Sequence, residues 1–336
     1  MLQMKGKQSV LFQEPVKIMS HACVGGKKEG EGPIGKHLDL IVDDPMFGKE
    51  NWEESESSFL KTAGEIAIRK GKKKKEDVRM AFCGDLLGQL IASSFGIAEL
   101  GIPYYGVYGA CSSIGAALSI GAMTVNGGFA DLVLTGCSSH FASAEKEFRL
   151  PLGYGSQRPL SATWTVTGSG AFVLGKRGGH VRISGVTPGK IVDMGSRDNM
   201  NMGACMAPAA CDTIERNLQD FRRTPSDYDR IITGDLGAVG KRILLDLLEE
   251  KGIDIGAQHM DCGIEIYDSE VQDTHSGGSG CGCAASTLSA LILPKLRRGS
   301  WKRVLFVPTG ALLSKVSFNE GKTIPGIAHA IILEHC

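Results

Sequence analysis

Four short motifs occur twice in this chain, in the same order, and each copy falls at an equivalent place in an alternation of strand-like and helix-like segments. The matched pairs are 82–86 with 232–236, 111–119 with 281–289, 135–136 with 309–310, and 171–174 with 330–333. Chance similarity of glycine-rich turns does not account for a shared order, so the pattern indicates an internal duplication. We therefore predict two similar halves, residues 1–178 and 179–336, packed about a pseudo-two-fold axis.

Within each half, segments rich in β-branched residues alternate with helix-like segments, which favours an α/β fold with mostly parallel strands. Strands are expected at 10–12, 16–23, 78–83, 103–108, 131–135, 170–175, 181–186, 230–233, 263–267, 304–307 and 327–333, and helices at 52–70, 87–100, 112–125, 206–218, 241–251 and 284–296. The Gly- and Lys-rich stretch 25–36 is expected to be a mobile loop or a lid.

The composition excludes several classes of function. Lys and Arg balance Asp and Glu at 37 each, and only 6% of residues are aromatic, so no nucleic-acid partner is expected. Ten scattered cysteines without a secretory leader favour a reducing cytosol. No apolar run is long enough for a transmembrane segment, so any membrane contact is expected to be peripheral. The lysine-rich run 70–75 is interpreted as a solvated helix end, with an anionic membrane surface as the alternative.

The first half contains a cysteine at a turn between a strand and a helix. Residues 104–108 predict a strand, and the small apolar residues after Ser112 and Ser113 predict a buried helix. Cys111 is thereby placed at the amino end of that helix, where the helix dipole and unpaired N–H groups favour a thiolate or a bound carboxylate. The alternative is that Cys111 is simply a small buried hydrophobic residue.

Two segments of the first half resemble the thiolase and ketoacyl-synthase superfamily. Gly109–Ser113 is similar to the family's nucleophile turn, and Thr167–Leu174 to the glycine-rich strand that closes its first half. The resemblance implies a thiolase-like fold, with two βαβαβαββ halves forming a layered αβαβα core, and a homodimer. In these enzymes the cysteine is acylated, while a histidine and an asparagine or second histidine from the other half stabilise the oxyanion.

The positions that correspond to those partner residues differ in this chain. The histidine turn holds Thr233–Leu236, including Asp235, and the asparagine turn holds Ser279–Cys283, including Cys281. A carboxylate repels a developing oxyanion, so we expect acyl condensation to be impaired and the chain not to be an enzyme. The alternative is a ketoacyl synthase III-like acyltransferase that uses Cys111 with His275 as a replacement base.

A more specific combination of motifs resembles the stage V sporulation protein AD family of spore-forming bacteria. The matching segments are Phe148-Arg149, Tyr154-Gly155, Thr165–Gly170, Met206–Ala210, Asp227–Asp229, Thr233–Leu236 and Gly277–Cys281. The resemblance implies a binding protein for dipicolinic acid, without a cofactor, that supports loading of this acid into the developing spore. It also implies partners from the same sporulation operon and a peripheral position on the cytoplasmic face of the spore inner membrane.

Dipicolinate is a flat pyridine with two carboxylates, so its pocket is expected near Cys111 and Cys281 and needs paired donors. The expected donors are the N–H groups of Ser112 and Ser113, with Arg149 or Arg158 as a fork for the second carboxylate. These arginines bracket the loop 151–157, which is expected near the pocket mouth, and ordinary surface ion pairs are the alternative for both.

His140 is a further candidate donor, with a satisfied core histidine as the alternative. Asp235 and Asp85 are interpreted as helix-capping turn residues, or as ligands of a calcium ion that accompanies the dipicolinate. The one-residue spacing of Cys281 and Cys283 does not fit zinc, so no metal site is predicted.

Overall fold

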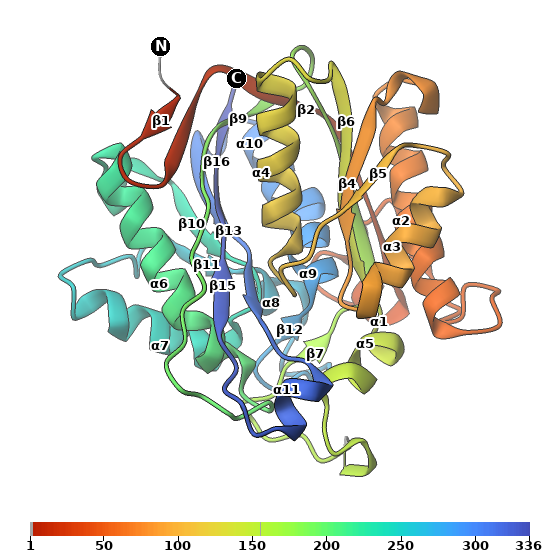
Figure 1. Ribbon diagram of the computed structural model, residues 1–336, viewed down its shortest axis with the longest axis vertical. Coiled ribbons are helices and arrows are strands. Elements are labelled where there is room, and N and C mark those ends of the chain that lie inside the picture. Colours follow the sequence, from red (N-terminus) through yellow and green to blue (C-terminus); the bar gives the residue numbers. More distant parts are fainter. Residues whose placement is uncertain (1–2, 155) are drawn as a thin grey trace.

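The two halves of the chain repeat one strand order in the computed structural model, which describes residues 3–154 and 156–336 (Figure 1). The first half has the order β2-β8-β6-β4-β5 and the second the order β9-β16-β13-β10-β11. When the strands are numbered along each half, both orders become 1-5-4-2-3, which confirms the internal duplication. The bounds are β2 Ser9–Gly26, β4 Met80–Gly84, β5 Tyr104–Gly106, β6 Leu132–Ser139, β8 Gly168–Gly175, β9 Val181–Thr187, β10 Arg230–Thr233, β11 His259–Asp261, β13 Arg303–Val307 and β16 Ala330–His335.

Antiparallel pairing between β2 and β9 joins the halves, with Val10 opposite Val186 and Ile18 opposite Val181. The described residues thereby form one 12-stranded sheet, in which β1 (Met4–Lys5) and β3 (Leu40–Val42) also pair with β2. Strand β4 is parallel to β5 and β6, and β10 is parallel to β11 and β13. Because parallel strands end at the same edge of a sheet, the turns after β4 and β5 lie together, as do those after β10 and β13.

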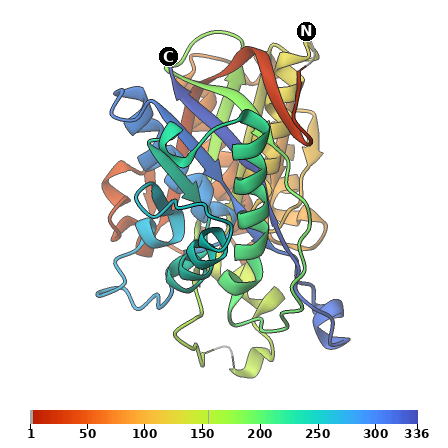
Figure 2. The ribbon, with the colours of Figure 1, turned by 90° about the vertical axis from the view of Figure 1, so that its left-hand side faces the viewer.

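The helices form three layers that alternate with the two halves of the sheet (Figure 1). Helices α2 (Trp52–Lys70) and α3 (Ile91–Ala98) cover the outer face of the first half. Helix α4 (Ser113–Asn126) lies between the halves with α9 (Cys281–Thr287), the π-helix η6 (Leu288–Ile292) and α10 (Leu293–Arg297). Helices α6 (Met202–Phe221, green) and α7 (Gly237–Glu249) cover the second half, as Figure 2 shows. The predicted αβαβα architecture is therefore confirmed.

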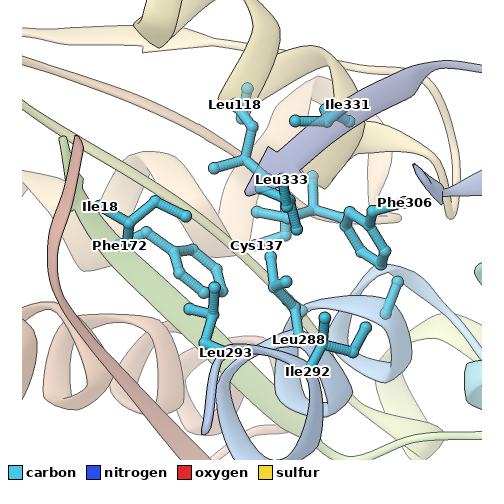
Figure 3. Packing of buried hydrophobic residues seen from close by; sticks show 14 of the residues in the cluster. Ile18, Leu118, Cys137, Phe172, Leu288, Ile292, Leu293, Phe306, Ile331 and Leu333 are labelled. Atoms are coloured by element: carbon cyan, nitrogen blue, oxygen red, sulfur yellow. The ribbon is translucent and has the colours of Figure 1, made fainter. Parts of the chain in front are cut away.

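The central helix layer is buried on both sides. In Figure 3, Leu118 of α4 and Leu288 and Ile292 of η6 lie among Phe172 of β8 and Phe306 of β13. All five side chains have no exposed surface. A helix that packs against two sheets must be apolar all round, which is why the sequence of α4 lacks a polar face.

The repeated motifs include a glycine at the carboxyl end of β4, Gly84, and one directly after β10, Gly234, and both glycines allow close backbone contact. A Cβ atom on Gly84 would lie 2.1 Å from the carbonyl oxygen of Val107, and one on Gly234 would lie 2.8 Å from the amide nitrogen of Thr309. Any larger residue would push away the neighbouring turn. The duplicated glycines thus hold the turn beside Cys111 and the turn beside Thr309 against the sheet.

Three sequence predictions are wrong. The sequence predicts mostly parallel strands, but β8 pairs antiparallel with β2 and β6, and β16 pairs antiparallel with β9 and β13. The sequence predicts a strand at 263–267, but α8 (Cys262–Ile266) is a helix, and β11 is the strand at this edge of the sheet. A short apolar run does not distinguish a strand from a helix. The segment 25–36 is not a mobile lid, because β2 extends to Gly26 and is followed by α1 (Lys27–Gly30) and a 3-10 turn at Gly35–His37. The buried carboxylate of Glu29 holds this segment through Tyr267 and the N–H of Thr167.

The remaining elements are short. They are the strands β7 Trp164–Thr165, β12 Gly278–Ser279, β14 Thr309–Ala311 and β15 Gly326–Ala328, the helices α5 Phe141–Phe148 and α11 Lys315–Asn319, and 3-10 turns at Lys75–Asp77, Gly88–Leu90, Leu152–Tyr154 and Pro225–Asp227. Gly155, in the loop expected near the pocket mouth, lies outside the described residues. Among the described helices, none has the length and apolar character that crossing a membrane requires.

Candidate functional site

Cys111 lies in the turn that connects β5 to α4, as the sequence predicted. The residue before it, Ala110, has a φ of 49°, in the left-handed region that non-glycine residues rarely adopt. Such a conformation costs about 1–2 kcal/mol, and it persists where the surrounding structure requires it. The strained turn therefore fixes the position of the Cys111 thiol at the amino end of α4.

The two serines after Cys111 stabilise this turn with their own donors. The N–H groups of Ser112 and Ser113 donate to the carbonyl oxygens of Gly109 and Ala110 at 3.0 and 3.1 Å. Their hydroxyl groups donate to the same two oxygens at 2.6 and 2.7 Å. The carboxylate site predicted at these N–H groups is thus occupied by the turn itself, and a ligand there would have to displace these hydrogen bonds.

Asp235 of the second half lies beside Cys111 and has no exposed surface. Its carboxylate accepts hydrogen bonds from the hydroxyl of Thr309 and the N–H of Gly280, both at 2.8 Å. Burial raises the pKa of Asp235 to about 7. The helix-capping role considered for Asp235 is wrong, because Asp261 accepts the N–H groups of Leu236 and Gly237 at the start of α7.

The Cys111 thiol is held in its protonated form. Burial raises the pKa of Cys111 well above its usual value, and the charge and hydrogen bonding of Asp235 raise it further. A thiolate stabilised by the helix dipole, as the sequence suggested, is therefore not what this environment favours. A protonated thiol is a weaker nucleophile than a thiolate.

A small, mainly apolar cavity of about 50 Å³ opens next to Cys111. It is lined by Leu86, Tyr108, Ala110, Cys111, Glu147, Phe148, Met202, Met206, Asp235, Ser279, Ala311 and Leu313. Among these described residues there is no histidine, asparagine, arginine or lysine, and both charged side chains are acidic. Among the described residues that line it, the cavity thus has no cationic group that would bind a carboxylate and no histidine or asparagine that would stabilise an oxyanion.

Cys281 occupies the position in the second half that matches Cys111, but it is fully buried and does not line the cavity. Its thiol donates to the carbonyl oxygen of Ser138 at 2.9 Å. Burial, followed by Cys137 nearby, raises the pKa of Cys281 well above its usual value. Cys281 and Cys111 influence each other electrostatically, so the structure does bring the two predicted thiols together.

The predicted arginines are engaged elsewhere and do not line the cavity. Arg149 is buried, forms an ion pair with Glu145 and donates to the carbonyl oxygen of Thr163 at 3.3 Å. Arg158 forms an ion pair with Asp273 at 2.7 Å and lies over the ring of Trp164. The surface ion pair considered as the alternative fits Arg158, whose partner Asp273 is exposed, whereas the ion pair of Arg149 is buried.

The two candidate histidines also lie outside the cavity. His140 caps α5 by accepting the N–H of Ala142 through Nδ1, and its Nε2 lies 2.9 Å from the carbonyl oxygen of Pro45. Burial lowers the pKa of His140, so it is a satisfied neutral histidine. His275 contacts the carbonyl oxygen of Pro159 through Nδ1 and Asp273 through Nε2, and it does not reach Cys111 as a replacement base.

The residues that could hold a cation are few. Asp85 is committed to its own turn, since its carboxylate accepts the N–H groups of Leu87 and Ser93 and the hydroxyl of Ser93. This confirms the capping interpretation for Asp85. In the described part of the chain, no group of three or more His, Cys, Asp or Glu residues could hold a metal ion.

Sequence reasoning missed Glu147, Tyr108 and Met202. Glu147 lines the cavity and forms an ion pair with Lys315 of α11 at 3.2 Å. These residues approach Cys111 from separate elements, and none belongs to a motif with a known spacing. Only the tertiary arrangement reveals them.

Sequence comparisons find similarity to known proteins over nearly the whole chain. A sequence model described as "Stage V sporulation protein AD (SpoVAD)" matches residues 6–334. Stage V sporulation protein AD of Bacillus subtilis (strain 168) is 40% identical over 333 residues, which cover 99% of this chain and 98% of that protein.

Solved structures with a similar fold include condensing enzymes. The 3-oxoacyl-[acyl-carrier-protein] synthase III of Aquifex aeolicus VF5 aligns with a TM-score of 0.59 and 15% identity, covering 95% of this chain and all of that one. The tetronic acid condensing enzyme AbyA1 aligns with a TM-score of 0.61 and 17% identity, covering 95% and 99% of the two chains. A variant of OleA from Xanthomonas campestris aligns with a TM-score of 0.60 and 15% identity, covering 96% and 99% of the two chains. At this level of identity the likeness shows the fold alone.

Proposed function

This chain belongs to the stage V sporulation protein AD family, and we propose that it acts in sporulation as a binding protein for dipicolinic acid and not as a condensing enzyme. The observation that carries the non-catalytic part is the contact between Cys111 and Asp235. In a condensing site, the cysteine must ionise and the neighbouring groups must donate to an oxyanion. Here the neighbour is an acceptor that keeps the thiol protonated.

The Cys111 cavity is the proposed binding site. Apolar side chains such as Leu86, Phe148 and Leu313 suit the faces of a flat pyridine ring, and the hydroxyl groups of Tyr108 and Ser279 can donate to its carboxylates. The present volume of about 50 Å³ holds only a few water molecules, so the cavity must widen to admit the ring. The unbranched side chains of Met202 and Met206 can adapt in this way.

The acidic side chains of the cavity are expected to make dipicolinate binding depend on pH. Ionised Asp235 and Glu147 repel a dicarboxylate, whereas a protonated Asp235 can donate to it. Because the pKa of Asp235 is raised to about 7, dipicolinate binding is expected to weaken as the pH rises through this value. A calcium ion between the ligand and these carboxylates would offset the repulsion, so calcium is a further variable of the test.

Isothermal titration with dipicolinate tests the proposal, at about pH 6 and pH 8 and with and without calcium. We expect saturable binding that an isomeric pyridine dicarboxylate does not match and that Cys111→Ala weakens at least several-fold, while the exposed Cys336→Ala leaves it unchanged. A lack of dipicolinate binding under all four conditions would contradict the proposed ligand.

A second assay tests whether Cys111 reacts as the nucleophile of a condensing enzyme. After incubation with an acyl-CoA, mass spectrometry of the peptide that contains Cys111 is expected to find no acyl thioester. A thioester that forms and turns over would instead support the ketoacyl synthase III-like alternative.

We also propose that the chain forms a homodimer through β5 and acts with other proteins of the same sporulation operon at the spore inner membrane, on its cytoplasmic face. Strand β5 is the last strand of its half of the sheet, and its Tyr105 side chain is 60% exposed. An uncovered strand edge with large apolar neighbours favours pairing with a second chain. The sporulation family supports the operon partners and the peripheral membrane position.

A further inference from the structure

A larger cavity of about 370 Å³ lies at the edge of the sheet opposite to Cys111. Its walls are β2, the start of β9, the carboxyl end of α2, η6 and α10. This is the edge at which β6 begins, because Lys17 of β2 pairs with Gly175 of β8, and Gly175 pairs with Leu132, the first residue of β6. Cys111 follows the carboxyl end of β5, so the two cavities are separate sites. The volume falls in the range of about 300–1,000 Å³ that is typical of small-molecule sites.

The charges of this cavity differ from those of the Cys111 cavity. Three cationic side chains line it, Lys70, Arg297 and Arg298, against one carboxylate, Asp39. Asp39 is already engaged, because one oxygen lies 2.8 Å from the Lys70 ammonium and the other accepts the N–H of Cys23 at 3.0 Å. The side chains of Arg297 and Arg298 are exposed and have no hydrogen bond or ion pair with residues 3–154 or 156–336. Their two guanidinium groups therefore remain for an anion.

A neutral histidine adds a donor that is not a surface cation. The ring of His21 stacks on Phe172, with centroids 6.5 Å apart, and its Nδ1 lies 2.8 Å from the hydroxyl of Ser289. Burial, helped by the charges of Lys70 and Arg297, lowers the pKa of His21 to about 4. When the Ser289 hydroxyl donates to Nδ1, Nε2 carries the proton. No described protein atom accepts it, which leaves Nε2 for a ligand.

We propose that this cavity binds the phosphoryl group of an organic phosphate through Arg297, Arg298, Lys70 and His21. The donors come from α10, α2 and β2, and a tetrahedral anion accepts hydrogen bonds from such different directions, whereas a carboxylate accepts within one plane. A guanidinium group also binds phosphate in a bidentate manner. The volume leaves room for the organic part of an ester.

Two sources offer this chemistry, a soluble phosphate ester and the headgroup of a phospholipid. The exposed Lys72 and Lys74 follow Lys70 in the chain and form no ion pair with described residues. At a membrane with anionic lipids, each such lysine contributes about 1 kcal/mol to binding. The inference does not rest on dipicolinate binding at Cys111.

The test compares the unmodified chain with R297Q/R298Q and with a control that removes the same charge, K241Q/R242Q. The control positions lie on α7, which covers the outer face of the second half. Isothermal titration with inorganic phosphate and with glycerol 3-phosphate measures the soluble source. Sedimentation with vesicles of phosphatidylcholine, with and without phosphatidylglycerol, measures the lipid source. Circular dichroism checks that both variants are folded, which is expected because Arg242, Arg297 and Arg298 are exposed and Lys241 is half-buried.

We expect wild type and K241Q/R242Q to bind at least one of these probes alike, and R297Q/R298Q to bind it at least tenfold more weakly. Binding of glycerol 3-phosphate identifies a soluble ester as the source, and binding of phosphatidylglycerol vesicles alone identifies the headgroup. Absence of binding to all probes, or an equal loss in both double variants, would overturn the proposal. The proposal would also be overturned if R297Q/R298Q lost dipicolinate binding and no phosphate binding was found. That result would leave the proposed function itself intact.

Discussion

At the scale of single residues, Asp235 determines the chemistry of the Cys111 turn. Its buried carboxylate accepts hydrogen bonds from Thr309 and Gly280, which hold it in place. Its charge, however, changes near neutral pH, because burial raises its pKa to about 7. The same residue therefore opposes ionisation of Cys111 and couples the site to pH.

This coupling predicts how stability depends on pH. The unfolded chain ionises Asp235 near its ordinary value of 3.8 and the folded chain near 7, so between these values the folded protein binds more protons. Its free energy of unfolding should then fall as the pH rises from about 4 to about 7. Asp235→Asn is expected to reduce this fall by on the order of 2 kcal/mol, in urea unfolding measured at several pH values.

The exposed Asp131→Asn is the matched control and should keep the wild-type pH dependence. Glu56, whose pKa burial raises to about 8, contributes a fall of the same sign in all three proteins, so Asp235→Asn will not abolish the dependence. Parallel curves for wild type and Asp235→Asn would mean that Asp235 stays ionised in the folded protein.

At the scale of elements, the segment around α1 shows how a buried polar side chain orders a stretch of glycine and lysine. Glu29 accepts hydrogen bonds from Tyr267 of the second half and from the N–H of Thr167. Lys28 and Gln272 exchange two further hydrogen bonds across the same contact. The Gly- and Lys-rich composition predicted mobility here. That prediction failed because the partners of Glu29 are distant in sequence and no local pattern indicates them.

Glu29→Ala should therefore loosen this segment. It leaves the Tyr267 hydroxyl and the Thr167 N–H buried without their acceptor, at a cost of about 1–3 kcal/mol in the free energy of unfolding. Hydrogen exchange across 25–40 is expected to accelerate, whereas the exposed Glu31→Ala should leave it unchanged. Equal exchange in the two variants would show that α1 is ordered without Glu29.

At the scale of the whole molecule, the architecture and the location of a pocket beside Cys111 were predictable, but most of the residues that line the cavity were not. Repeated motifs are local and keep their order, so they indicated two equivalent halves with the same succession of elements. The cavity depends on side chains from residue 86 to residue 313 that meet only after folding. Arg149 and His140 were plausible ligand donors as isolated residues, but Glu145 and Pro45 already engage them.

The apolar edge beside β5 gives the last prediction, which concerns assembly. Tyr105 on β5 and Phe95 on α3 are 60% and 64% exposed, and Ile91 on α3 is exposed as well. Neighbouring large apolar residues on an unpaired strand edge favour burial against a second copy of the chain. Light scattering after size-exclusion chromatography should therefore give the mass of a dimer at micromolar concentration.

The double variant Y105K/F95K is expected to be monomeric, because burying two lysines in the interface is unfavourable. The pair Val271→Lys and Val316→Lys is the control, since both valines are exposed on loops or helices away from β5. A wild-type monomer would contradict the dimer, and a dimer that survives Y105K/F95K would place the interface on another face of the molecule.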